Sequence, residues 1–216
     1  MNRSPKRAFG SNRRVIHLKP NLFGTLNLIS RFYATLFWYT PKLIRLRFQY
    51  KKRPQKASPR VVIYSDNLDE TNGISVNSRI VTSHMRAMGK DVYLVGSTFH
   101  TTPKGRIEHN GTILAPQLFS LEQYGYKDSE MAIPALGDLI RVFKRLPPDL
   151  LEIETPASGA SLVALAAIIV GIPVVQHYRT DMFAYMDKLQ VSWFDKNFTK
   201  AWIRLICKIT RPIIVP

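Results

Sequence analysis

The sequence predicts an α/β protein: a Rossmann-like, doubly wound parallel sheet that carries a basic helical arm at its N-terminus. From residue 60 onward, short apolar runs alternate with helical segments, which is typical of a parallel sheet with helices on its faces. A polar loop containing Gly73 separates the first strand of this series from the first helix. The residues before position 60 differ in charge from everything that follows.

The basic charge is concentrated at the N-terminus. Of the 31 Lys and Arg residues, 15 lie in residues 1–60, and the first acidic residue is Asp66. The other 16 basic residues face all 15 acidic ones, so the net charge of +16 belongs to the N-terminal segment. We therefore divide the chain into an arm, residues 1–59, and a domain, residues 60–216. Cys207 is the single cysteine, which excludes an internal disulfide and fits a reducing compartment.

The arm combines basic, aromatic and aliphatic residues. Residues 1–20 are polar and predicted to lack fixed structure, residues 21–39 are apolar, and Pro41 is predicted to end the apolar segment. That segment fits a helix in the headgroup region of a bilayer, a spanning helix, or a helix packed on the protein itself. Its aromatic and basic mixture favours the first, with residues 1–56 bound to an anionic membrane surface. We do not expect nucleic acid, because the arm has no folded recognition motif.

The first half of the domain begins with a buried strand at 60–64, a short run of Val, Ile and Tyr. An amphipathic helix follows at 76–88 and ends at a glycine. Residues 92–95 are again apolar and predict the next strand. An Asn-Gly pair within 105–114 favours a type I′ turn and therefore a hairpin.

The second half of the domain alternates in the same way. Apolar residues at helical spacing predict helices at 129–145, from about 155 to 170, and at 190–208. Short apolar runs between and after these helices predict strands at 149–154, 172–177 and 211–216. Prolines and a glycine at the junctions end the helices.

The loop after the first strand is the main candidate binding site. Open α/β sheets place their ligands at the carboxyl ends of the strands, and Gly73 allows backbone N–H groups to approach a ligand closely. A simple turn before a helix is the alternative for this Asn-Gly pair. Asp66, Asp69 and Glu70 are read as solvated turn residues rather than metal ligands, because no other ligand type accompanies them.

Four segments of the domain resemble a known family. They are the loop at 70–75, the Pro-Asp to Thr-Pro segment at 148–156, the Gly-Ile-Pro-Val-Val strand at 171–175 and the Tyr-Arg-Thr-Asp loop at 178–181. With these motifs in this order, residues 60–216 resemble the N-terminal domain of the family-four (group 1) GT-B glycosyltransferases. Many members of that family have Tyr-His-Thr-Asp at the last position.

The resemblance implies a hexosyltransferase in which a sugar moves from a nucleotide-sugar co-substrate to an acceptor held between two Rossmann-like domains. The N-terminal domain holds the acceptor, and its first glycine loop, here Asn72, Gly73 and Ile74, contacts the donor diphosphate. No other cofactor and no metal are implied. The family's nucleotide-sugar pocket lies in a second domain, which these 216 residues do not contain, so we expect the function to require that second domain.

The resemblance also implies site residues at the other strand ends. Arg179 and Asp181 are the candidate catalytic residues. Arginine stays protonated at neutral pH, so Arg179 is expected to orient a phosphate or sugar hydroxyl rather than act as a base. The candidate substrate-binding residues are Thr155, His177, Tyr178 and Thr180. Helix capping is the alternative for Thr155 and Asp181, and a hydrogen-bonded core histidine is the alternative for His177.

The basic arm and the Trp-, Phe- and Lys-rich helix at 190–208 favour a lipid or lipid-linked acceptor. The expected location is therefore the cytoplasm, peripheral at the inner face of the membrane. The alternative function is a non-catalytic scaffold that uses a glycosyltransferase-like fold to bind a lipid or a partner protein. In that case Arg179, which stands where the family has its active-site histidine, indicates that the catalytic activity has been lost.

Overall fold

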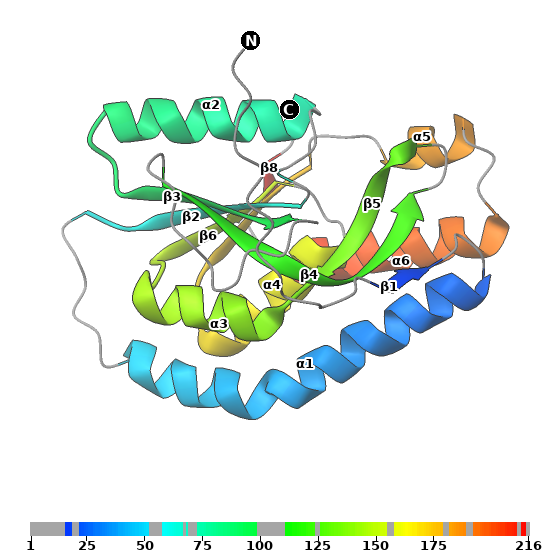
Figure 1. Cartoon of the computed structure of the whole chain (residues 1–216), viewed down its shortest axis with the longest axis horizontal. Coiled ribbons are helices and arrows are strands. Elements are labelled where there is room, and N and C mark those ends of the chain that lie inside the picture. The colour runs from blue at the N-terminus through cyan, green and yellow to red at the C-terminus, as the bar shows by residue number, and fades with distance from the viewer. Residues whose placement is uncertain are drawn as a thin grey trace, which may run out of the picture.

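The protein is α/β, with a mostly parallel sheet flanked by helices (Figure 1), which is compatible with the predicted Rossmann-like arrangement. The computed structural model describes residues 16–18, 22–51, 58–66, 68, 73–98, 111–123, 126–154, 158–178, 182–188, 192–210 and 213–214.

The described strands form one sheet. They are β1 (Ile16–Leu18), β2 (Val61–Ser65), β3 (Val92–Thr98), β4 (Thr112–Gln123), β5 (Tyr126–Pro134), β6 (Leu150–Ile153), β7 (Val174–His177) and β8 (Ile213–Ile214). The order is β1-β4-β3-β2-β6-β7-β8, and β5 pairs with β4 in the one antiparallel ladder among the described strands. When the strands are renumbered from β2 onward and β5 is left out, their order is 3-2-1-4-5-6. This is the order of dinucleotide-binding sheets.

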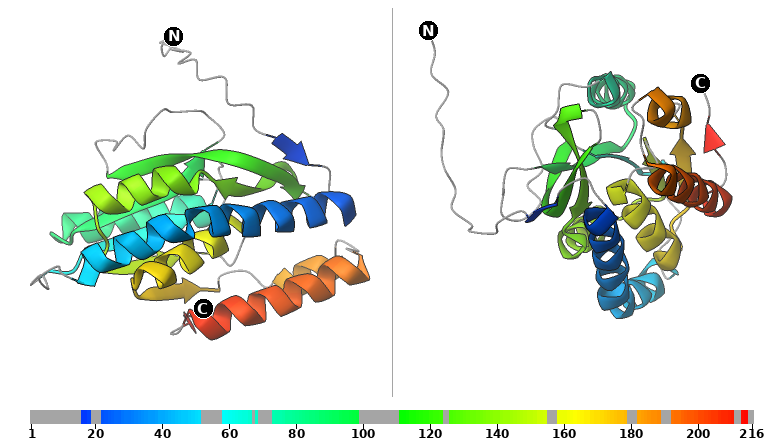
Figure 2. Two further views of the ribbon diagram at one scale, coloured as in Figure 1. Left: turned by 90° about the horizontal axis from the view of Figure 1, so that it is seen from below. Right: turned by 90° about the vertical axis from the view of Figure 1, so that its right-hand side faces the viewer.

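The helices cover both faces of the sheet unequally. They are α1 (Leu22–Lys51), α2 (Gly73–Ala87), α3 (Leu136–Arg145), α4 (Ser158–Val170), α5 (Met182–Lys188) and α6 (Trp193–Ile209). Helices α1, α3 and α4 share a core with one face of the sheet, and α2 lies on the opposite face (Figures 1 and 2). Helix α6 joins the first group, because the indole N–H of Trp202 donates to Ser161 Oγ of α4 at 3.1 Å.

Strand alternation divides the core into two parts. On β2, Val62 and Tyr64 face α1, α3 and α4, whereas Ile63 faces α2 together with Leu94 of β3. Successive side chains of a strand point to opposite faces, so a strand buried on both faces reads as a continuous apolar run. Helix α4 is buried almost all round, which explains why its sequence is apolar without a polar face.

Helix α1 corrects part of our interpretation of the N-terminal segment. It runs without a break through Pro41, which we predicted to end it. A proline inside a helix removes one hydrogen bond and bends the axis, and α1 is bent in its middle (Figure 1). Pro41 lies on the exposed side of the helix, so its ring does not disturb the core. Leu28 and Leu43 are buried in the core that α1 shares with the sheet.

Three other predicted elements differ from the structure. The helix predicted at 129–145 is a strand up to Pro134 and a helix only from Leu136, because residues 126–134 pair with β4. The hairpin predicted at 105–114 lies outside the described residues up to position 110, and from Thr112 the chain forms β4, which is parallel to β3. Residues 16–18, predicted to be unstructured, form β1 beside β4.

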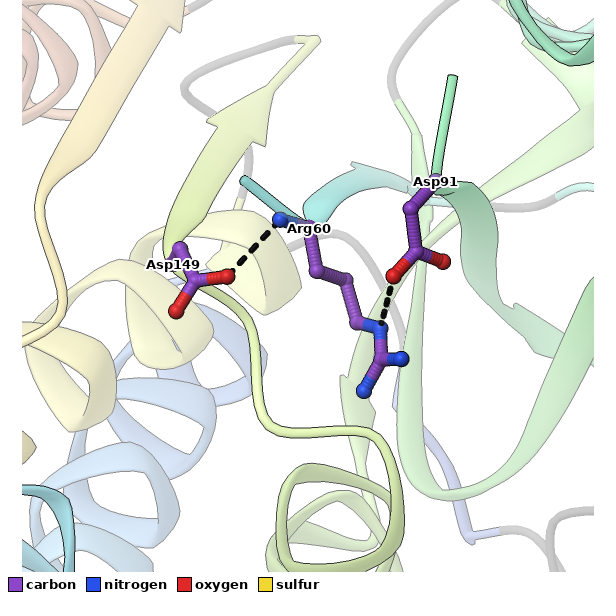
Figure 3. Close-up of polar contacts among 3 residues, drawn as sticks. All are labelled: Arg60, Asp91 and Asp149. Carbon is purple, nitrogen blue, oxygen red and sulfur yellow. Dashed lines mark hydrogen bonds and ion pairs between the residues drawn. The ribbon is translucent and has the colours of Figure 1, made fainter. Parts of the chain in front are cut away.

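Arg60 fixes the amino edge of the sheet (Figure 3). Its backbone N–H donates to Asp149 Oδ2 at 2.8 Å, just before β6, and its guanidinium Nε donates to Asp91 Oδ2 at 2.9 Å, just before β3. The amino ends of three neighbouring strands are therefore held together by one residue. The aspartate of the Pro-Asp motif thus has a structural partner at the edge opposite the candidate site.

Candidate functional site

The candidate site lies at the carboxyl edge of the sheet, where β2 and β6 are neighbours. From β2 the strand order continues outward through β3 on one side, and from β6 through β7 on the other. Ligands of open α/β sheets bind at the point where the order reverses in this way. Helices α2 and α4 follow β2 and β6 and begin at this edge, and the N-terminus of a helix favours an anion.

The structure places four of the nine predicted site residues at this edge. Gly73 and Ile74 are the first residues of α2, His177 is the last residue of β7, and Tyr178 follows it. The other five lie outside the described residues: Asn72, Thr155, Arg179, Thr180 and Asp181. The described residues thus come from both sides of the reversal point.

Gly73 stands in open space. A Cβ atom built on it would meet no other atom within 4 Å, and the residue is exposed. Neither packing nor a positive φ requires glycine at the start of α2. The space that a side chain of residue 73 would fill is therefore free of other described atoms.

Asp66 links the two sides of the reversal point. It follows β2, and its Oδ2 accepts a hydrogen bond from the backbone N–H of Ala160, in the first turn of α4, at 3.1 Å. A carboxylate at this position satisfies a free N–H group and interacts favourably with the helix dipole. Our interpretation of Asp66 as a solvated turn residue is therefore wrong, whereas Asp69 and Glu70 lie outside the described residues.

Tyr64 is a buried residue of β2 that helps to hold this edge of the sheet together. Its ring is completely buried, and its hydroxyl lies 2.8 Å from Ser97 Oγ of β3. Burial, and next the negative charge of Asp66, raise the pKa of the Tyr64 hydroxyl well above its usual value. The phenol is therefore neutral at physiological pH, and its contact with Ser97 joins the ends of β2 and β3.

Leu68, which follows β2, lies against Gly96 of β3. A Cβ atom on Gly96 would lie 2.3 Å from Leu68 Cγ and 2.6 Å from the backbone oxygen of Ser65. The backbone oxygen belongs to β2 and cannot move without disturbing the ladder. Sequence reasoning missed this contact, although a glycine inside a strand is a known sign of close backbone approach.

Gly96→Ala is therefore expected to lower the free energy of unfolding by about 1–3 kcal/mol, the usual cost of overpacking. Urea denaturation of the two proteins measures the difference. Gly73→Ala is the matched control, because its added methyl group meets no other atom, and it should not lower the stability. Equal stability of Gly96→Ala and the wild type would contradict the close packing of Leu68 on β3.

His177 lies close to two glutamates, Glu152 of β6 and Glu154 in the turn that follows. Its Nε2 contacts Glu152 Oε1. Glu152 is opposite Val175 in the parallel ladder between β6 and β7, so Glu152, Glu154 and His177 lie on the same face of the sheet. Sequence reasoning missed both glutamates, although their spacing of two along a strand places them on one face.

A second feature lies on the face covered by α1 and α6. The two helices are neighbours, because the ring of Trp202 lies 5.0 Å from that of Phe32 and 6.5 Å from that of Tyr33 (Figure 2). Large apolar and basic side chains are exposed on their outer sides. These residues, here called the aromatic–basic surface, are Phe23, Phe37, Trp38, Lys42, Arg45, Phe48, Trp193, Arg204, Leu205, Lys208 and Ile209.

The charged residues that define the aromatic–basic surface are all basic. Helix α1 contains no acidic residue, whereas Lys42 and Arg45 lie on its exposed side. Phe37 and Trp38 are 81% and 74% exposed, and an exposed cluster of large apolar side chains marks an interaction surface. Among the described helices, none has the length and apolarity that crossing a membrane requires.

Comparison with known proteins yields no family for this chain, since no family model and no curated protein matches it.

Proposed function

We propose that this chain is the acceptor-side domain of a GT-B glycosyltransferase of the family-four type. Together with a donor-side domain, it moves a sugar from a nucleotide sugar to a lipid or lipid-linked acceptor. The reaction takes place at the cytoplasmic face of an anionic membrane, to which the protein binds peripherally. The strand order of the sheet and the four sequence motifs at 70–75, 148–156, 171–175 and 178–181 support this proposal.

The open space at Gly73 is the observation that carries the transferase part. It lies beside the first N–H groups of α2, at the point where the strand order reverses. A nucleotide-sugar diphosphate gains negative charge as the glycosidic bond to it breaks, and fixed backbone N–H donors stabilise such a developing charge. In this role Gly73 and Ile74 supply the donors, and a side chain at position 73 would hold the phosphate away.

The aromatic–basic surface supports the lipid part. Aromatic side chains lie well at the interface between headgroups and acyl chains, and Lys and Arg attract anionic lipids. Both helices that form this surface pack on the domain that carries the candidate site. A lipid acceptor in the same membrane would therefore be presented to a domain already held at the bilayer.

Gly73→Ala is expected to reduce sugar transfer by at least about tenfold, in line with the loss of a transition-state donor contact. Its stability should not fall, because alanine favours the helix. Gly89→Ala, at the other end of α2, is the matched control. Gly89 has a φ of +75°, so alanine there is expected to destabilise the fold by about 1 kcal/mol while leaving transfer by the folded protein unchanged. The reverse pattern of effects would contradict the role of Gly73.

The overall proposal is tested with the product of the full open reading frame, a panel of labelled nucleotide sugars and anionic liposomes that contain lipid-linked acceptors. Transfer of label to the lipid fraction is the expected result. Binding to liposomes without turnover of any nucleotide sugar would contradict the enzyme and favour the lipid-binding scaffold. The two functions are thus separated by one assay with two readouts.

A further inference from the structure

Three potential metal ligands converge on the sheet face beside β6 and β7. Each of Glu152, Glu154 and His177 offers one ligand atom, and these three atoms lie within 4.8 Å of one another. The residues come from two adjacent parallel strands and the turn that follows β6. Their positions are therefore fixed by the ladder rather than by a mobile surface loop.

The cluster is shielded from water. Glu154 is only 1% exposed, and Glu152 and His177 are largely shielded from water. Buried carboxylates are costly unless a cation is close. A cation bound among these atoms would offset the cost of burying the two carboxylates.

The Nε2 atom of His177 lies at this cluster. This nitrogen is buried, lies against Glu152 Oε1 and makes no hydrogen bond to any described residue. In an imidazole that carries its proton on Nδ1, Nε2 has a lone pair in the plane of the ring, and this lone pair can bind a metal ion.

From this geometry we propose that Glu152, Glu154 and His177 bind one divalent first-row metal ion, with Zn²⁺ as the best match. Zn²⁺ takes imidazole nitrogen and carboxylate oxygen at about 2.0–2.2 Å. Ligand atoms around one tetrahedral ion are then roughly 3.4 Å apart, so small side-chain rotations would close the site. Two carboxylates and a neutral imidazole also balance the charge of a divalent ion, and three ligands leave one coordination position for water.

The site is tested by calorimetric titration of the chelator-treated chain with Zn²⁺, which is expected to show one ion per chain. His177→Gln is expected to weaken this binding by at least about tenfold, since even the loss of an outer-shell partner weakens metal binding by that factor. Glu152→Gln should act in the same direction. In the wild type, Zn²⁺ at about 100 times its Kd should raise the Tm by about 5–10 °C.

His84→Gln is the matched control, because His84 is an exposed histidine of α2 outside the cluster, and it should bind Zn²⁺ like the wild type. Unchanged affinity in folded His177→Gln, or no saturable binding by the wild type, would overturn the proposal and leave a proton-bridged ion pair. If His177→Gln does not fold, Co²⁺ added to the wild type decides, since bound Co²⁺ gives visible absorption and its absence contradicts the site. None of these readouts depends on sugar transfer.

Discussion

Leu43→Ala is expected to lower the free energy of unfolding by about 2–5 kcal/mol, as for a leucine removed from a well-packed core. Leu43 is 0% exposed and belongs to the core that α1 shares with α3, α4 and the sheet. The substitution removes buried methyl groups and leaves a cavity that two helices and a sheet cannot readily fill. Urea denaturation followed by circular dichroism measures the loss.

Ile44→Ala provides a control at the next position of the same helix. Ile44 is 44% exposed, so its truncation should cost less than about 1 kcal/mol. If both variants had the stability of the wild type, α1 would be a detachable arm rather than a part of the core. Alanine has a higher helix propensity than leucine or isoleucine, so a loss of stability in either variant reports packing.

This packing changes how the membrane role of the N-terminal segment has to be examined. Deleting residues 1–56 would remove α1 and expose the side of α4 and α3 that it covers. The deleted protein would lose stability whatever its membrane affinity, and its exposed core would bind liposomes non-specifically. Substitutions confined to the exposed side of α1 avoid this problem.

The elements closest to the candidate site were the easiest to predict from the sequence. The first strand was predicted at 60–64 and is β2 (Val61–Ser65), and the helix predicted at 76–88 is α2 (Gly73–Ala87). Both have short-range signals, namely an apolar run and an amphipathic period with a glycine at its end. The alternation of strands and helices predicted a parallel sheet, but the reversal of the strand order between β2 and β6 is known only from the structure.

The remaining features depend on partners distant in the chain. Residues 126–134 have mixed composition and form β5 because β4 is available to pair with them. Asp66 contacts Ala160, 94 positions away, and His177 contacts Glu152. Spacing along the sequence shows which residues share a face, but it does not show which neighbour a polar side chain will find across the sheet.

Replacing Phe37 and Trp38 together by serine is expected to weaken binding to anionic liposomes by about 100-fold, because each large apolar side chain contributes of the order of 1.5 kcal/mol or more when it leaves water. Both are among the most exposed side chains of α1, so the Tm should stay close to that of the wild type. Liposome sedimentation at several salt concentrations measures the binding. Arg45→Ala should weaken it by about fivefold at low salt and less at high salt, as expected for a basic residue near an anionic surface.

The matched control replaces Val76 and Ile80 of α2 by serine. These residues are also exposed and apolar, but they lie on the helix that covers the opposite face of the sheet. If liposome binding depended on general hydrophobicity, both pairs would weaken it equally, and the aromatic–basic surface would have no special role. Selective loss in the Phe37 and Trp38 variant would instead orient the domain, with α1 and α6 against the bilayer and α2 away from it.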